Sequence, residues 1–119
     1  MFKRVMIVLS VILIISCIAY AVADNTFGKK EIIYVYSKTC RACMFFKPIY
    51  NQFKDSHKSG AKFVELDADT FQGRSFVIDN RISHIPFILM VNNDKKYVPS
   101  GMCMFDYQCL NDMYNDVMK

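Results

Sequence analysis

Two cysteines separated by two residues, Cys40 and Cys43, restrict the fold of this chain more than any other feature of its sequence. They follow an apolar, β-prone run over residues 32–36 and precede an amphipathic helical pattern. At such a turn the first cysteine lies on the free N–H groups of the helix, where the positive end of the dipole favours a thiolate. The second cysteine is close enough to attack a mixed disulfide. The pair therefore suits thiol–disulfide exchange. A structural disulfide, half of a metal site and a chance spacing are the alternatives, and the placement weighs against chance.

Length and charge limit the class of protein. With 119 residues and 53% hydrophobic content, the chain has room for one small domain. The formal net charge of +4 is mild, and the charges are mixed along the chain without a basic stripe. A nucleic-acid partner is therefore not expected.

The N-terminal segment is typical of an export signal. Lys3 and Arg4 form a cationic head, residues 5–19 are almost entirely apolar, and Ala21-Val22-Ala23 has the small-x-small form of a signal peptidase site. Export would place the domain in the periplasm or cell envelope, an oxidising compartment where cysteine pairs indicate disulfides or disulfide enzymes.

Three fates of this segment stay open. Cleavage after Ala23 is the preferred one. Retention as a membrane anchor comes second, because the apolar run approaches the ~20 residues of a membrane-spanning helix. Lipidation comes third, because Ile14-Ile15-Ser16-Cys17 loosely matches a lipobox with Cys17 as the lipid-bearing residue. An ordinary small apolar residue in a signal core is the simpler interpretation of Cys17.

Hydrophobic periodicity predicts an α/β domain with the element order β-α-β-α-β-β-α. We divide the chain into a signal peptide or membrane anchor (1–23), a polar linker (24–30) and one folded domain (31–119). The expected elements are a strand over 31–36, a helix over 41–57, a strand over 61–66, a short irregular helix over 70–80 interrupted by Gly73, strands over 87–91 and 95–98, a loop over 101–104 and a final helix capped by Asp106.

The first strand is nearly continuously apolar, which predicts a central strand buried on both faces. In the helix that follows, Phe45, Ile49 and Phe53 recur every four residues and are expected to form its buried face. Ser37 or Thr39 is expected to cap this helix.

The same residues resemble the thioredoxin family. The C-x-x-C follows the first strand, Pro48 lies five residues beyond Cys43, Ile85-Pro86 stands just before an antiparallel strand, and Gly101 precedes the last helix. The N-terminal strand and helix of full thioredoxins are missing. The resemblance therefore implies the minimal thioredoxin fold, a central mixed four-stranded sheet flanked by helices and preceded here by the N-terminal hydrophobic helix.

The resemblance also implies the roles of the site residues. Cys40 would be the nucleophile and Cys43 the resolving thiol. Arg41 and Ala42, between them, would tune the pair, because a cation beside a thiolate makes the disulfide more oxidising. A further role falls to Ile85 and Pro86, whose peptide bond would be cis and would present the Ile85 backbone to an extended substrate. No metal and no cofactor is expected.

Several departures from the family predict an atypical redox centre. Thr39 replaces the Trp that usually precedes the first cysteine. At the aromatic position near the end of the strand, Tyr36 stands in place of Trp. Tyr34 stands where the family has a buried Asp thought to handle the proton of the second cysteine, and no carboxylate replaces it by sequence position. The Ile before Pro86 resembles the reductive members, whereas Arg41 and the lost Asp point the other way.

A second pair, Cys103 and Cys109, admits three interpretations. A structural disulfide between the loop and the last helix is favoured, given export and the even count in the exported part. A relay that exchanges electrons with the C-x-x-C is the second. The third is soft-metal binding, such as Cu(I), with Met102 and Met104.

The leading hypothesis is therefore an exported thiol–disulfide oxidoreductase that acts on cysteines of envelope proteins, with a slight preference for a reductase or maturation factor. It would be a monomer with a membrane redox partner. A Cu(I)-binding metallochaperone-like protein and a non-catalytic thioredoxin-like interaction module are the alternatives.

Overall fold

The computed structural model describes the backbone of residues 1–23 and 29–119 and the side chains of residues 1–15 and 29–119. The elements along the chain are α1 (Phe2–Ala23), β1 (Lys30–Tyr36), α2 (Arg41–His57), β2 (Lys62–Asp67), α3 (Phe71–Asp79), β3 (Phe87–Asn92), β4 (Lys95–Tyr97), α4 (Gly101–Met104) and α5 (Tyr107–Val117). Most of the expected linker, residues 24–28, lies outside the described residues, as do the side chains of Cys17 and of the expected cleavage site. Within the described part of the chain, no helix is both long and apolar enough to cross a membrane.

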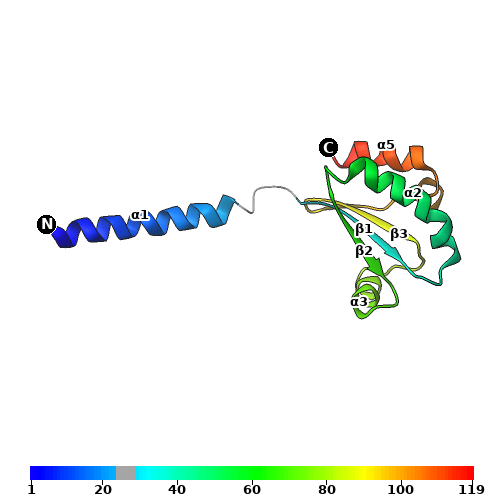
Figure 1. Cartoon of the computed structure of the whole chain (residues 1–119), viewed down its shortest axis with the longest axis horizontal. Helices are drawn as coiled ribbons and strands as arrows, with labels where there is room; N and C mark the ends of the chain where they lie inside the picture. Colours follow the sequence, from blue (N-terminus) through cyan, green and yellow to red (C-terminus); the bar gives the residue numbers. More distant parts are fainter. Residues whose placement is uncertain (24–28) are drawn as a thin grey trace.

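The sheet has four strands in the order β2-β1-β3-β4, with β1 parallel to β2 and antiparallel to β3. As expected, the most apolar strand is central, and Ile32 and Val35 on its two faces are fully buried. Figure 1 shows α2 and α5 on one face of the sheet and α3 on the other. This is the predicted mixed sheet flanked by helices, with one α2 crossover between the parallel strands.

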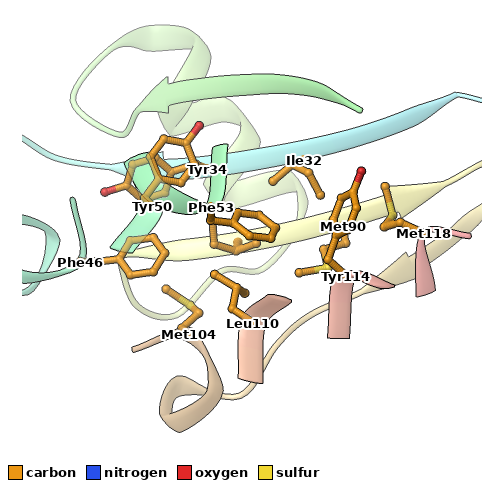
Figure 2. Packing of buried hydrophobic residues seen from close by; sticks show 11 residues of the cluster. Ile32, Tyr34, Phe46, Tyr50, Phe53, Met90, Met104, Leu110, Tyr114 and Met118 are labelled. Carbon is orange, nitrogen blue, oxygen red and sulfur yellow. The ribbon is translucent and has the colours of Figure 1, made fainter. Parts of the chain in front are cut away.

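The core lies between the sheet and the layer of α2 and α5. Figure 2 shows its members, which come from β1, α2, β3, α4 and α5 and include Ile32, Tyr34, Phe46, Tyr50, Phe53, Met90, Met104, Leu110, Tyr114 and Met118. The rings of Tyr50 and Tyr34 pack at a tilt of 32° with centroids 4.2 Å apart, and Phe53 meets Tyr114 edge-on at 5.6 Å. Aromatic contacts thus join the first strand to both helices of this layer.

Of the three residues expected on the buried face of α2, Phe53 is buried and Ile49 is half-buried against the core, but Phe45 is not buried. Phe45 is 70% exposed, whereas Phe46 and Tyr50 are buried together with Phe53. Because Phe45 and Phe46 are adjacent, the apolar pattern allows two rotations of the helix about its axis. The flat aromatic surface that Tyr34 presents from β1 selects the rotation that buries Phe46 and Tyr50.

Gly73 does not interrupt α3, which runs without a break from Phe71 to Asp79. The Thr70 side chain caps the helix by accepting a hydrogen bond from the Gly73 N–H at 3.2 Å. A Cβ at position 73 would collide with the carbonyl oxygen of Asp67 at the end of β2. The glycine is therefore required by the close approach of α3 to the end of β2, not by a helix break.

Residues 101–104 form the short helix α4 rather than the expected loop. Ser100 caps it, since its Oγ accepts from the Cys103 N–H at 3.2 Å. The final helix begins as predicted, with Asp106 Oδ1 accepting from the N–H groups of Gln108 and Cys109. Two successive polar caps thus turn the chain from β4 into α5.

We expect Gly73→Ala to destabilise the domain by about 1–3 kcal/mol, because the added methyl must displace backbone at Asp67. Gly101→Ala is the matched control, since a Cβ at position 101 meets nothing within 4 Å. The measurement is the free energy of unfolding by urea. Equal stabilities of the two variants would contradict the close-approach explanation.

Candidate active site

The first cysteine of the C-x-x-C is itself the N-cap of α2. Cys40 has extended backbone (φ −79°, ψ 112°), and its Sγ accepts from the Cys43 N–H at 3.1 Å. The expected cap, Ser37 or Thr39, was therefore wrong. Ser37 is buried and instead donates to Asp69 Oδ2 at 2.7 Å, which ties the loop before the cysteine to the segment after β2.

The two cysteines form a disulfide across the first turn of α2. Their Cα atoms lie 5.2 Å apart. Cys43 is 5% exposed, whereas Cys40 is half-buried, so attack from outside reaches the first sulfur more readily. Arg41 and Ala42, which the sequence marks as tuning residues, lie exposed between them.

The loop before β3 lies against the first cysteine. The Ile85–Pro86 peptide bond is cis, as the resemblance implied, and Pro86 is buried. The carbonyl oxygen of Ile85 is 3.8 Å from Cys40 Sγ. The fold thus brings together two segments 45 residues apart in sequence and leaves backbone polar groups beside the accessible sulfur.

A cavity of about 340 Å³ opens on the other side of the disulfide, next to Cys43. Its lining comes from β1, the following loop, α2 and β2, and comprises Tyr34, Tyr36, Ser37, Lys38, Cys43, Met44, Lys47, Tyr50, Asn51 and Glu65. Figure 2 shows the rings of Tyr34 and Tyr50, which form part of this lining, side by side at one end of the core. The cavity is therefore a second approach to the redox centre, separate from the Ile85 side.

A hydrogen-bonded group of side chains lies at this cavity, with Tyr50 buried and the side chains of Lys54 and Glu65 partly exposed. The Tyr50 hydroxyl donates to Glu65 Oε1 at 3.0 Å, and Lys54 Nζ forms an ion pair with the same oxygen at 2.9 Å. Glu65 lies on β2 directly opposite Tyr34 of β1 in the strand register.

These contacts shift the pKa values of the group. Burial, followed by the charge of Glu65 and then by Tyr36, raises the pKa of Tyr34 to about 12. Burial and Glu65 also raise the pKa of Tyr50. Chiefly through the Lys54 hydrogen bond, against a smaller opposing effect of burial, the pKa of Glu65 falls below its ordinary value. At neutral pH, therefore, both phenols are protonated and Glu65 is ionised.

The comparisons with known proteins agree with this geometry. The thioredoxin family model matches residues 20–102, well over half of the chain. This chain belongs to the thioredoxin family. It is a redox protein of the thioredoxin fold, a thiol–disulfide oxidoreductase with its disulfide at Cys40 and Cys43. No curated protein sequence matches the chain.

Solved structures of the family share the fold at low sequence identity. The J-Trx1 fragment of ERdj5 is 12% identical with a TM-score of 0.66, over 76% of this chain but only 42% of that fragment. The germline-specific thioredoxin Deadhead of Drosophila melanogaster is 14% identical, TM-score 0.63, over 83% of this chain and 90% of its own. Mitochondrial thioredoxin 3 of Saccharomyces cerevisiae is 15% identical with a TM-score of 0.61, and the match covers 76% of this chain and 81% of that protein.

In this thioredoxin-family chain, sequence reasoning missed Tyr50, Lys54 and Glu65. Glu65 was overlooked because it lies 22 residues beyond Cys43 and on another strand. The signal that could have found it is the parallel pairing of the first two strands, which places it opposite Tyr34, the position of the missing Asp.

The second cysteine pair is also joined, and the disulfide links α4 to α5. Of its neighbours, Met104 is buried in the core, and Phe105 meets Phe46 of α2 with centroids 5.6 Å apart. The disulfide thus holds the α4 turn where its side chains contact the active-site helix. The structural role favoured from the sequence stays a prediction, since a relay would also hold these two sulfurs as a disulfide.

We expect the free energy of unfolding of the Cys103→Ala/Cys109→Ala variant to be about 2 kcal/mol lower, because the disulfide no longer restricts a short loop in the unfolded chain. Its disulfide-exchange activity should persist at temperatures where it is folded. Urea unfolding and an insulin-reduction assay measure the two quantities. If the folded variant loses activity instead, the pair is a relay and not a structural disulfide.

Proposed function

We propose that this chain is an exported thiol–disulfide oxidoreductase that exchanges disulfides with cysteines of cell-envelope proteins. The half-buried Cys40, capping α2 beside the Ile85 carbonyl, carries the proposal. Export rests on the cationic head and the apolar run at the N-terminus. Along α1, the large apolar side chains between Val5 and Ile15 are all exposed. Whether the segment is cleaved, retained or lipidated follows the order of preference given by the sequence.

An extended polypeptide suits the surface around Cys40. The backbone of Ile85 can pair with a substrate strand, which supplies affinity without regard to side chains. Met44 and Phe45, which are 69% and 70% exposed on the first turns of α2, offer apolar contacts beyond the cysteines. A substrate cysteine in a strand-like segment with apolar neighbours is therefore the expected target.

We favour the reductive direction. The Cys40 thiolate attacks a substrate disulfide and forms a mixed disulfide while one substrate thiolate leaves. Cys43 then attacks Cys40 Sγ, which releases the second substrate thiol and leaves the Cys40–Cys43 disulfide for a membrane electron donor to reduce. The ionised Glu65, which lines the same cavity as Cys43, supports this preference, because a negative charge on that cavity disfavours the thiolate form of Cys43 and so stabilises the oxidised pair.

No observation favours the copper alternative. Among the described residues, no group of three or more His, Cys, Asp or Glu side chains gathers as metal ligands would. We therefore carry one function forward.

For the reductive direction, we expect a reduction potential near that of thioredoxins, about −270 mV, and far from the about −120 mV of the strongest oxidants. It is measured by equilibrating the Cys40–Cys43 pair with glutathione or dithiothreitol. We further expect Cys40→Ser to abolish insulin reduction and Cys43→Ser to accumulate mixed disulfides. Activity that survives in Cys40→Ser would refute the assignment of the nucleophile, and a potential near −120 mV would reverse the direction.

For the export, we expect the full chain to be found outside the cytoplasm on fractionation, in a form shortened by residues 1–23. Mass spectrometry of the product identifies cleavage after Ala23, and Cys17→Ala serves as the control. If membrane retention disappears in Cys17→Ala alone, the segment is lipidated. Recovery of the intact chain in the cytoplasm would contradict export.

A further inference from the structure

The resolving step requires a proton acceptor next to Cys43. This thiol must lose its proton before or while it attacks Cys40 Sγ, since the thiolate is the nucleophile. Cys43 is 5% exposed, and burial in apolar surroundings disfavours its charged form. Cys43 lines the cavity described above, whose volume of about 340 Å³ is ample for several water molecules.

The lining of this cavity offers few acceptors. Burial and the charge of Glu65 raise the pKa values of Tyr34 and Tyr50, so these two phenols hold their protons at neutral pH. Lys38 and Lys47 are cations and have no lone pair to accept a proton. Among the described residues that line the cavity, Glu65 is the only carboxylate.

We propose that Glu65, from β2, accepts the proton of the Cys43 thiol through the solvent of this cavity. The inference rests on the exchange function proposed above. In the balanced step, the Cys43 S–H proton passes to the Glu65 carboxylate as Cys43 Sγ bonds to Cys40 Sγ. The bond between Cys40 and the substrate sulfur breaks, and the departing substrate thiolate takes a proton from solvent.

Two residues of α2 position Glu65 for this role. The Tyr50 hydroxyl and the Lys54 ammonium both bond to Oε1. Oε2 receives no hydrogen bond from the described part of the chain, which leaves it available to cavity water. Tyr50 is 2% exposed and packed against Tyr34, so one of the two donors is rigidly placed.

The same contacts set the pH range of the step. The charged and titratable groups that face Glu65 are Lys54, Lys47 and Tyr50 from α2 and Tyr34 from β1. The lysines and the Tyr50 hydrogen bond keep the pKa of Glu65 below its ordinary value. The acceptor is therefore ionised even in mildly acidic solution, where the free thiolate of an ordinary cysteine is scarce.

The test separates the two steps of disulfide exchange. Full-length chain carrying Cys17→Ala, so that Cys17 adds no third thiol, is reduced at Cys40 and Cys43 and mixed with excess dithiobis(nitrobenzoate) in a stopped-flow instrument. The first released nitrothiobenzoate reports attack by Cys40, and the second reports resolution by Cys43. Cys43→Ser, which can release only the first, identifies the phases. Should Cys103 and Cys109 also become reduced, the same measurements are made in the Cys103→Ala/Cys109→Ala background.

In Glu65→Gln we expect the second phase to slow about 100-fold at about pH 6, the scale of general-base catalysis, with the first phase unchanged. In Glu65→Gln the rate of the second phase should then rise about tenfold per pH unit towards the pKa of the thiol. In the unaltered chain the rate of the second phase should be constant over the same pH range. Lys54→Met should move the acidic end of the plateau to higher pH without removing it, because Lys54 is the main cause of the lowered pKa of Glu65. Glu31→Gln, on β1 and outside the cavity lining, is the matched control and should change neither phase.

An unchanged or faster second phase in Glu65→Gln would overturn the proposal. A carboxylate that acted only through its charge would repel the Cys43 thiolate, so its removal would accelerate resolution. Failure of the exchange function looks different, because the first phase itself would then be absent in the unaltered chain. Circular dichroism of Glu65→Gln, with Glu65→Asp as a carboxylate-bearing variant expected to recover part of the plateau, separates loss of the acceptor from loss of the fold.

Discussion

The packing of one aromatic face of α2 on the central strand β1 is the interaction on which the rest of this structure depends. Phe46, Tyr50 and Phe53 are buried against Tyr34 and its neighbours, each contributing on the order of 1.5–3 kcal/mol. This contact sets the rotation of α2 about its axis. The rotation in turn decides that Cys43 points inwards while Phe45 remains at the surface.

The redox centre follows from that rotation and from the end of β1. Cys40 occupies the N-cap because the strand ends at Tyr36 and a short loop, anchored by the buried Ser37, leads into the helix. The inward turn of the helix places the buried Cys43 in the lining of the cavity between β1, α2 and β2. The cis-proline loop before β3 then reaches Cys40 from the opposite side. The two sulfurs consequently meet different surroundings, one half-buried beside the Ile85 carbonyl and the other buried in the lining of the cavity.

That interior is where this chain departs most from its family. An aromatic residue at position 34 removes a carboxylate from β1, and the space is taken by stacked rings. The neighbouring strand supplies Glu65 to the same cavity, and α2 supplies Lys54 and the Tyr50 hydroxyl to hold it. The cavity that Cys43 lines thus holds a carboxylate, but it comes from a different strand, and a lysine lowers its pKa.

The sequence by itself determined the order of elements, the central strand, the C-x-x-C at a strand–helix turn and the Ile85-Pro86 loop, because periodicity, turn residues and cysteine spacing are local patterns. It was wrong about the buried face of α2 because Phe45 and Phe46 are equally apolar neighbours, and only contact with Tyr34 distinguishes them. It misjudged Gly73 because a helix break and a close backbone approach leave the same residue in the sequence. Glu65 was decided by tertiary structure alone, since the parallel pairing of β1 with β2 sets it opposite Tyr34, in the lining of the cavity that Cys43 also lines.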